Sequence, residues 1–150
     1  MSREILFRGQ TRRKGARINM NGEPLPSIWV YGGVFLSKSN FSVIYKGVFR
    51  RESRVYTDTV DQFIGATDKN GVKIFENDIL EFESDGETTH GLVIYDKYTA
   101  QYCVCNTDGK LNSRFRIGNE CTVVGNFHDD PELLNESQFE THELYCAILD

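Results

Sequence analysis

The chain has 150 residues, of which 39% are hydrophobic and 26% are charged. This composition is typical of a folded globular protein and excludes a disordered one, and the length suffices for one hydrophobic core without disulfides or metal. The formal net charge of −5 argues against a protein that binds nucleic acid over its whole surface, although it allows a local basic patch.

The sequence contains no segment that indicates export or membrane insertion. No stretch reaches the roughly 20 apolar residues that a membrane-spanning helix needs, and the charged N-terminus lacks the apolar segment of a secretory signal. We therefore expect a cytoplasmic protein with no membrane partner. In that compartment the cysteines would be reduced thiols; they are Cys103, Cys105, Cys121 and Cys146.

Short β-prone runs separated by turn residues dominate the first half of the chain and predict a β-rich N-terminal region. Residues 27–37 form two apolar runs broken by Gly32 and Gly33, which predicts a hairpin or a bulged strand. The other expected elements are strands at residues 3–8, 41–50, 54–59 and 62–67, and a basic loop or hairpin at residues 9–19.

Residues 68–82, DKNGVKIFENDILEF, combine two turn signals with the start of a strand. Asn70 and Gly71 adopt positive φ at low cost and predict the first turn, and Asn77 with Asp78 predicts the second. A routine structural role is expected for Asp78, whose carboxylate would accept hydrogen bonds from nearby backbone N–H groups.

The strand at residues 79–83 would place Leu80 and Phe82 on one face. Further strands are expected at residues 90–96, 101–106 and 121–127, with hairpin turns at Asp85-Gly86 and Asp108-Gly109. The whole pattern predicts a mainly β fold.

One short helix is expected near the C-terminus, with Asp130 as N-cap and Pro131 in the first helical position. The following segment, residues 138–150, is ambiguous between helix and strand. Its apolar run at residues 144–149 must be buried on this chain or on a second copy, so homo-oligomer formation is a further expectation. The residues assigned to this self-association are Leu144, Tyr145, Ile148 and Leu149.

Four blocks of sequence in matching order, REILFR, residues 62–82, GLVIYD and VVGNFHDDPELL, together resemble the YopX-like family of phage and prophage proteins. The resemblance implies a small SH3-like β-barrel in residues 61–135, after a divergent β-rich region at 1–60 and before an extension at 136–150. One compact unit is expected overall. The resemblance implies no activity. The motif residues, expected to be structural, are Asp68, Asn70, Gly71, Ile74, Phe75, Asp78, Ile79, Gly125, Asn126, Pro131 and Leu133.

Neither an enzyme nor a bound cofactor is expected. Paired carboxylates could perform acid–base chemistry, but turn and solvent-face roles explain this set better: Glu76, Asp78, Glu81 and Glu83. A zinc site would need four N or S ligands with C-x₂₋₄-C spacing, and these candidates lack that spacing: Cys103, Cys105, Cys121 and His128.

Two basic clusters are the strongest indication of nucleic-acid binding, and aromatic residues interleave with the second. The basic residues are Arg12, Arg13, Lys14, Arg17, Lys46, Arg50, Arg51 and Arg54, and the aromatic residues are Phe41, Tyr45, Phe49 and Tyr56. The negative net charge of the whole chain weighs against nucleic-acid binding. The sequence therefore favours a protein-binding module, with a phage or host protein as partner, and leaves nucleic-acid binding as the alternative.

Overall fold

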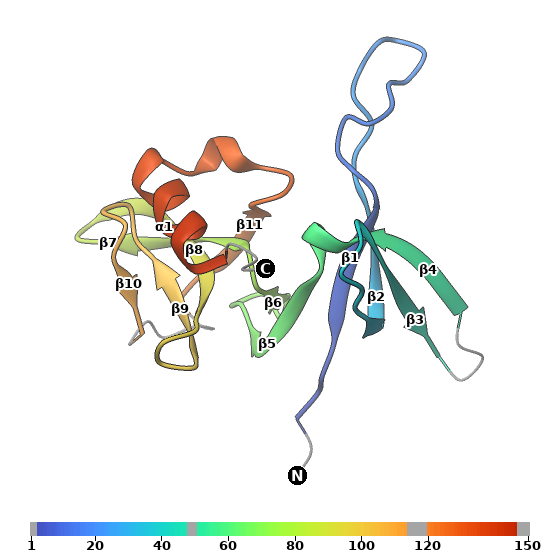
Figure 1. The fold of residues 1–150 in the computed structure, drawn as a ribbon. Coiled ribbons are helices and arrows are strands. Elements are labelled where there is room, and N and C mark those ends of the chain that lie inside the picture. The colour runs from blue at the N-terminus through green and yellow to red at the C-terminus, as the bar shows by residue number, and fades with distance from the viewer. Residues whose placement is uncertain (1–2, 48–50, 114–119, 147–150) are drawn as a thin grey trace. The chain divides into compact units, whose positions relative to one another are not determined.

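The structure is a computed structural model that describes residues 3–47, 51–113 and 120–146 (Figure 1). The chain divides into two compact units, Met1–Phe63 and Ile64–Asp150, which we call the N-terminal and C-terminal units. Both are built mainly from antiparallel strands, which confirms the prediction of a mainly β protein. Among the described residues, no helix is both long and apolar enough to cross a membrane.

The N-terminal unit is an antiparallel sheet with the strand order β4-β3-β2-β1-β5. Its elements are β1 (Phe7–Arg12), β2 (Ile28–Phe35), β3 (Phe41–Lys46), β4 (Arg51–Tyr56), the 3₁₀ turn Thr57–Thr59 and β5 (Asp61–Thr67). The first strand was predicted at residues 3–8, and this was wrong. It begins at Phe7 and continues to Arg12, because pairing with β2 extends it into the basic segment.

The prediction of a break at Gly32 and Gly33 was also wrong, since β2 is continuous through both glycines. The reason is the neighbouring strand. A Cβ atom on Gly32 would collide with the carbonyl oxygen of Tyr45, and one on Gly33 would lie 2.7 Å from the Tyr45 ring. These glycines therefore serve close strand packing rather than a turn.

The interior of this unit is a small apolar core that also contains a buried ion pair. Ile44 and Val55 are fully buried, and Val55 packs against the backbone of Gly9, which brings β1 close to β4. Nε of Arg8 lies 3.1 Å from Oδ2 of Asp61, with both side chains buried. A buried pair of this kind fixes the arrangement of β1 and β5 more than it adds stability.

The C-terminal unit contains an antiparallel sheet with the strand order β10-β9-β8-β7-β11, in which β7 to β10 form a meander and β11 pairs with β7 on its other side, and β6 pairs with β5. Its strands are β6 (Lys73–Phe75), β7 (Asp78–Ser84), β8 (Glu87–Asp96), β9 (Gln101–Cys105), β10 (Leu111–Asn112) and β11 (Thr122–Asn126). The turn predicted at Asp85-Gly86 is confirmed, because both residues have positive φ, 53° and 80°.

Alternation along these strands gives the sheet two buried faces. One face packs Leu80, Val93 and Cys121 together with Ile74, and Phe82 lies against this cluster, as predicted. The other face packs Ile79, Leu92, Ile94 and Cys105 against the segment that follows β11. That segment contains the 3₁₀ turn Pro131–Leu133 and helix α1 (Glu136–Cys146).

A helical segment does begin at Pro131, as predicted, but it is only a 3₁₀ turn, and Asp130 does not cap it. The turn after Asp130 is a short 3₁₀ helix without a side-chain cap, because Oδ2 of Asp130 accepts a hydrogen bond from the backbone N–H of Asn126 instead. The principal helix is α1, which forms from the ambiguous segment. It begins with a reciprocal pair: Gln138 N–H donates to the side chain of Asn135, and Asn135 N–H donates to that of Gln138, each at 3.0 Å.

The turn of the family motif is organised by Asp68, which is buried. Oδ1 accepts hydrogen bonds from the backbone N–H groups of Asn70 and Val72 at 2.8 and 3.0 Å, and Oδ2 accepts one from Val123 at 3.0 Å. Burial alone would raise the pKa of this carboxyl, but the three N–H groups outweigh it and lower the pKa below its ordinary value. Asp68 therefore ties the turn to β11.

Candidate functional site

Strands β2, β3 and β4 present an outward surface rich in aromatic side chains, which we call the aromatic face. Cross-strand register places Phe35 beside Val43, Val43 beside Arg54, and Tyr45 beside Glu52. Alternation therefore brings one set of side chains to this face: Trp29, Tyr31, Phe35, Phe41, Val43, Tyr45, Glu52, Arg54 and Tyr56.

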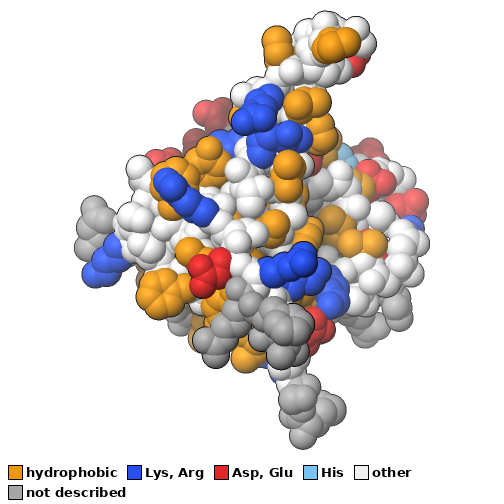
Figure 2. All heavy atoms as spheres, turned by 90° about the vertical axis from the view of Figure 1, so that its right-hand side faces the viewer, with side chains coloured by type: hydrophobic (Ala, Val, Ile, Leu, Met, Phe, Trp, Pro, Cys, Tyr) orange, Lys and Arg blue, Asp and Glu red, His pale blue; other side chains and the backbone are white. Residues whose placement is uncertain are grey.

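Three of these rings are unusually open to solvent. The exposed fractions are 71% for Phe35, 42% for Tyr31 and 40% for Tyr45. Phe35, Val43, Tyr45 and Glu52 line a shallow hollow of about 420 Å³. In Figure 2, hydrophobic side chains lie next to Lys and Arg side chains over a broad part of the surface in view. A group of neighbouring exposed aromatic side chains indicates an interaction site, whereas single exposed aromatic side chains do not.

Arginine side chains stack on the rings of this sheet. The guanidinium carbon of Arg54 lies 3.8 Å from the centre of the Phe41 ring, and that of Arg13 lies 4.2 Å from the centre of Tyr56. The two rings are themselves 5.2 Å apart. Arg13 also forms an exposed ion pair with Asp58 at 2.8 Å. Stacking holds each guanidinium in place while its N–H edge can still face a ligand.

The charge of the chain is divided very unevenly between the two units. Residues 1–63 contain 11 Lys and Arg against 5 Asp and Glu, a formal net charge of +6, whereas residues 64–150 contain 6 against 17, a net charge of −11. The overall value of −5 conceals this division. Counting charge separately in each half of the sequence would have revealed it.

The structure separates the basic residues that the sequence had grouped together. The guanidinium of Arg12 donates to the carbonyl oxygen of Pro26 at 3.1 and 2.9 Å. Lys46 and Arg51 are cross-strand partners on the opposite side of the sheet from Tyr45. Lys14 and Arg17 are exposed in the connection after β1, and Arg50 and Phe49 lie outside the described residues. Of the described residues in the two predicted basic clusters, Arg13 and Arg54 stack on rings of the aromatic face, and the buried Arg8, which belongs to neither cluster, stacks on Trp29 at 4.4 Å.

The four residues of the zinc hypothesis are not brought together. Cys105 and Cys121 belong to different buried clusters, on opposite faces of the sheet. In the described ranges, no three His, Cys, Asp or Glu side chains are close enough to hold a metal ion. Burial raises the pKa of Cys103 and of Cys105, which keeps both thiols protonated at neutral pH.

Two of the four carboxylates considered for acid–base chemistry have separate structural partners. Oδ2 of Asp78 accepts a hydrogen bond from the backbone N–H of Phe75 at 2.8 Å, and Oε2 of Glu81 lies 3.0 Å from Nε2 of His90. Asp78 is buried and Glu81 is half-buried. The role expected for Asp78 as a turn acceptor thus matches its observed contact.

The residues expected to mediate self-association lie at the end of α1. Leu144 is 71% exposed, whereas Tyr145 packs against the cluster of Ile79, Leu92 and Cys105. The apolar run at residues 144–149 was expected to be buried, and this chain does not bury its first residue, Leu144. The other two, Ile148 and Leu149, lie outside the described residues.

The geometry defines a mainly β protein with two sheets and a C-terminal helix, whose basic unit carries an aromatic face. The family model described as YopX protein matches residues 36–135, and the chain belongs to the YopX family. The resemblance noted from the sequence is thereby confirmed. No curated protein matches the chain. A similar solved structure is the crystal structure of protein EF1440 from Enterococcus faecalis, with 21% identity and a TM-score of 0.46, covering 89% of this chain and 100% of that one.

Proposed function

We propose that this YopX family protein is a non-enzymatic accessory protein of phage or prophage origin that binds single-stranded nucleic acid on the aromatic face. The observation that carries this proposal is the group of exposed rings, Tyr31, Phe35 and Tyr45, beside the stacked guanidinium of Arg54. The phage origin rests on the resemblance to the family.

The chemistry of the face suits a single strand. Unpaired bases stack on aromatic side chains, and each such contact contributes about 1–3 kcal/mol whatever the base. Arg54 forms no ion pair among the described residues, so its guanidinium is available for a phosphate. The net charge of +6 in this unit would raise the local concentration of a polyanion.

Glu52 gives the face a polar position that does not suit a phosphate. It lines the hollow together with Tyr45, so a phosphate there would meet a like charge. Its carboxylate can accept hydrogen bonds from the amino group of a base, as acidic side chains do with cytosine. We therefore place the bases over the hollow and the phosphates near Arg54 and Arg13.

The C-terminal unit supplies a scaffold in this proposal. We infer that its sheet, β10-β9-β8-β7-β11, is an open form of the SH3-like barrel that the family resemblance implies. Two observations support this inference: β7 to β10 are consecutive antiparallel neighbours, with β11 antiparallel to β7, and both faces of the sheet are packed.

Replacing both Phe35 and Tyr45 with alanine is expected to weaken binding of an oligothymidylate by roughly 30-fold or more, because two stacking contacts are lost. Both side chains are exposed, so the fold should be retained. Fluorescence anisotropy with the labelled oligonucleotide measures the effect. The matched control is Tyr98→Ala, which removes an aromatic side chain 77% exposed in the acidic unit and should leave the affinity unchanged.

The salt dependence of the same titration provides an independent readout. The logarithm of the affinity should fall with the logarithm of salt concentration, and Arg54→Ala should reduce the slope by about 0.7 if one phosphate contact is lost. Equal affinity of the double variant and the wild type would refute the proposed face, as would failure of the wild type to bind.

Protein binding, which the sequence analysis favoured, is the second candidate function. The specific observation is that β4 lies at the edge of its sheet. A strand of a phage or host protein could pair with the backbone N–H and C=O groups of such an edge. A partner that protects the amides of β4 from hydrogen exchange, with no change at the rings of the aromatic face, would favour this function over the first.

A further inference from the structure

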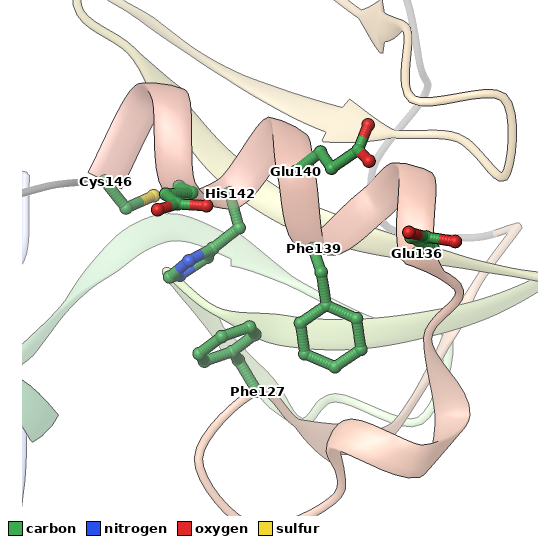
Figure 3. A pocket seen from close by; sticks show the side chains of 7 residues that line it. Phe127, Glu136, Phe139, Glu140, His142 and Cys146 are labelled. Carbon is green, nitrogen blue, oxygen red and sulfur yellow. The ribbon is translucent and has the colours of Figure 1, made fainter.

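A groove on the C-terminal unit has an apolar floor formed by two phenylalanines (Figure 3). The Phe127 ring stacks on the imidazole of His142, with centres 3.7 Å apart and an angle of 10° between planes, and meets Phe139 edge-on at 5.6 Å. Cys146 lies at one end of the groove. The groove has a volume of about 450 Å³.

The groove is already formed by internal contacts of this unit. Nε2 of His142 is hydrogen-bonded to Oδ1 of Asn77 at 2.9 Å. The side-chain amide of Gln138, which is fully buried, donates to the carbonyl oxygens of His90 and Cys105 at 2.9 and 3.1 Å and so fixes α1 on the sheet. A preformed site of this kind loses little conformational entropy when a partner binds.

The rim of the groove is acidic. Glu136, Glu140 and Glu143 line it, and no lysine or arginine is among its lining residues. The unit that carries it has a net charge of −11. A nucleic acid is therefore repelled, and the complementary occupant is a cationic segment with an apolar side chain to insert.

The chain itself contains a segment with this chemistry, the hairpin of residues 13–25. The hairpin is ordered by backbone hydrogen bonds between Gly15 and Leu25 and between Leu25 and Arg17, each 2.8 Å. Met20 is completely exposed at its tip and Ile18 is 66% exposed. Exposed apolar side chains on an ordered, cationic hairpin indicate a contact surface.

We propose that the chain self-associates, with the hairpin of residues 13–25 of a second copy docked in this groove. Met20 lies in the groove against the rings of Phe127 and Phe139, where its thioether makes favourable contacts with the aromatic groups. Lys14 and Arg17 of the hairpin then face the glutamates of the rim. Reciprocal exchange of hairpins between two copies closes a twofold dimer.

This proposal is tested separately from nucleic-acid binding, because the groove lies on the other unit and the hairpin substitutions leave Phe35, Tyr45 and Arg54 of the aromatic face unchanged. Either one can fail without the other. An interface of one hairpin tip is small, and small interfaces give weak and reversible association. The attraction between charges at the rim is screened by salt, so association should weaken as ionic strength rises.

Sedimentation velocity of the full chain across micromolar concentrations tests the proposal. The wild type should shift from monomer towards dimer as concentration rises, and two variants should remain monomeric: Met20→Asp, and Glu140→Lys with Glu143→Lys. Matched controls that should still associate are Val72→Asp and the pair Glu83→Lys with Glu87→Lys, all at exposed positions away from the groove. A wild type that is monomeric throughout, or groove variants that associate normally, would overturn it.

A charge swap makes the test specific for the two surfaces. The variant Lys14→Glu with Arg17→Glu should be monomeric alone, as should Glu140→Lys with Glu143→Lys. An equimolar mixture should form a heterodimer, because each hairpin then meets a groove of opposite charge. A mixture that stays monomeric contradicts the docking of this hairpin in this groove.

Discussion

Replacing Asp68 with alanine should lower the free energy of unfolding by about 3–5 kcal/mol, because three backbone N–H groups lose a charged acceptor in a buried position. These N–H groups belong to Asn70, Val72 and Val123. Urea denaturation measures the loss. Asp108→Ala is the matched control: Asp108 accepts a single turn hydrogen bond from Lys110 N–H at an exposed site, so the cost there should be about 1 kcal/mol or less.

The same residue should give the protein a pH-dependent component of stability. The pKa of Asp68 is lower in the folded chain than its ordinary value, which is about 3.9 in unfolded peptides. Its contribution is therefore fully present above that value and is lost as pH falls through the lower folded-state pKa. Asp68→Ala should flatten the stability curve in this acidic range. An unchanged curve would show that the charge of Asp68 does not stabilise the turn.

Replacing Gln138 with alanine should cost about 2–4 kcal/mol and loosen α1 from the sheet. The substitution leaves the carbonyl oxygens of His90 and Cys105 without the amide that they now bind, and it removes the acceptor for Asn135 N–H. Hydrogen exchange of the α1 amides and urea denaturation measure the two effects. The neighbouring exposed position, Glu140→Ala, should change stability by no more than about 0.5 kcal/mol. Comparable losses in the two variants would contradict the anchoring role of Gln138.

Local signals were enough to predict most strands and turns of the C-terminal unit. Asp85-Gly86 and Asn77 adopt positive φ, as turn residues of these types do, and Leu80 and Phe82 share a face through simple alternation. The start of α1 was also readable from the sequence in principle. Asn135 and Gln138 have the spacing of a capping box, a signal that the ambiguous composition of the tail obscured.

Other features depend on contacts between distant segments, which local sequence patterns do not carry. Gly32 resembles a turn residue until its approach to Tyr45 on the neighbouring strand is known. In the same way, Arg13 reaches the aromatic face only because the fold brings β1 close to β4 and places its guanidinium over Tyr56. The interleaving of aromatic and basic residues in β3 and β4 was visible in the sequence. The sequence did not show which of the basic side chains share a face of the sheet with the aromatic rings.

An NMR titration of the full chain with an oligothymidylate tests the central claim, that the aromatic face binds single-stranded nucleic acid, most directly. The backbone amide spectrum reports binding at the strands of both units in one experiment. The account predicts saturable shifts at Tyr31, Phe35, Tyr45 and Arg54, with the C-terminal unit unaffected. Shifts confined to residues 64–150, or no shifts at oligonucleotide concentrations well above that of the protein, would contradict it.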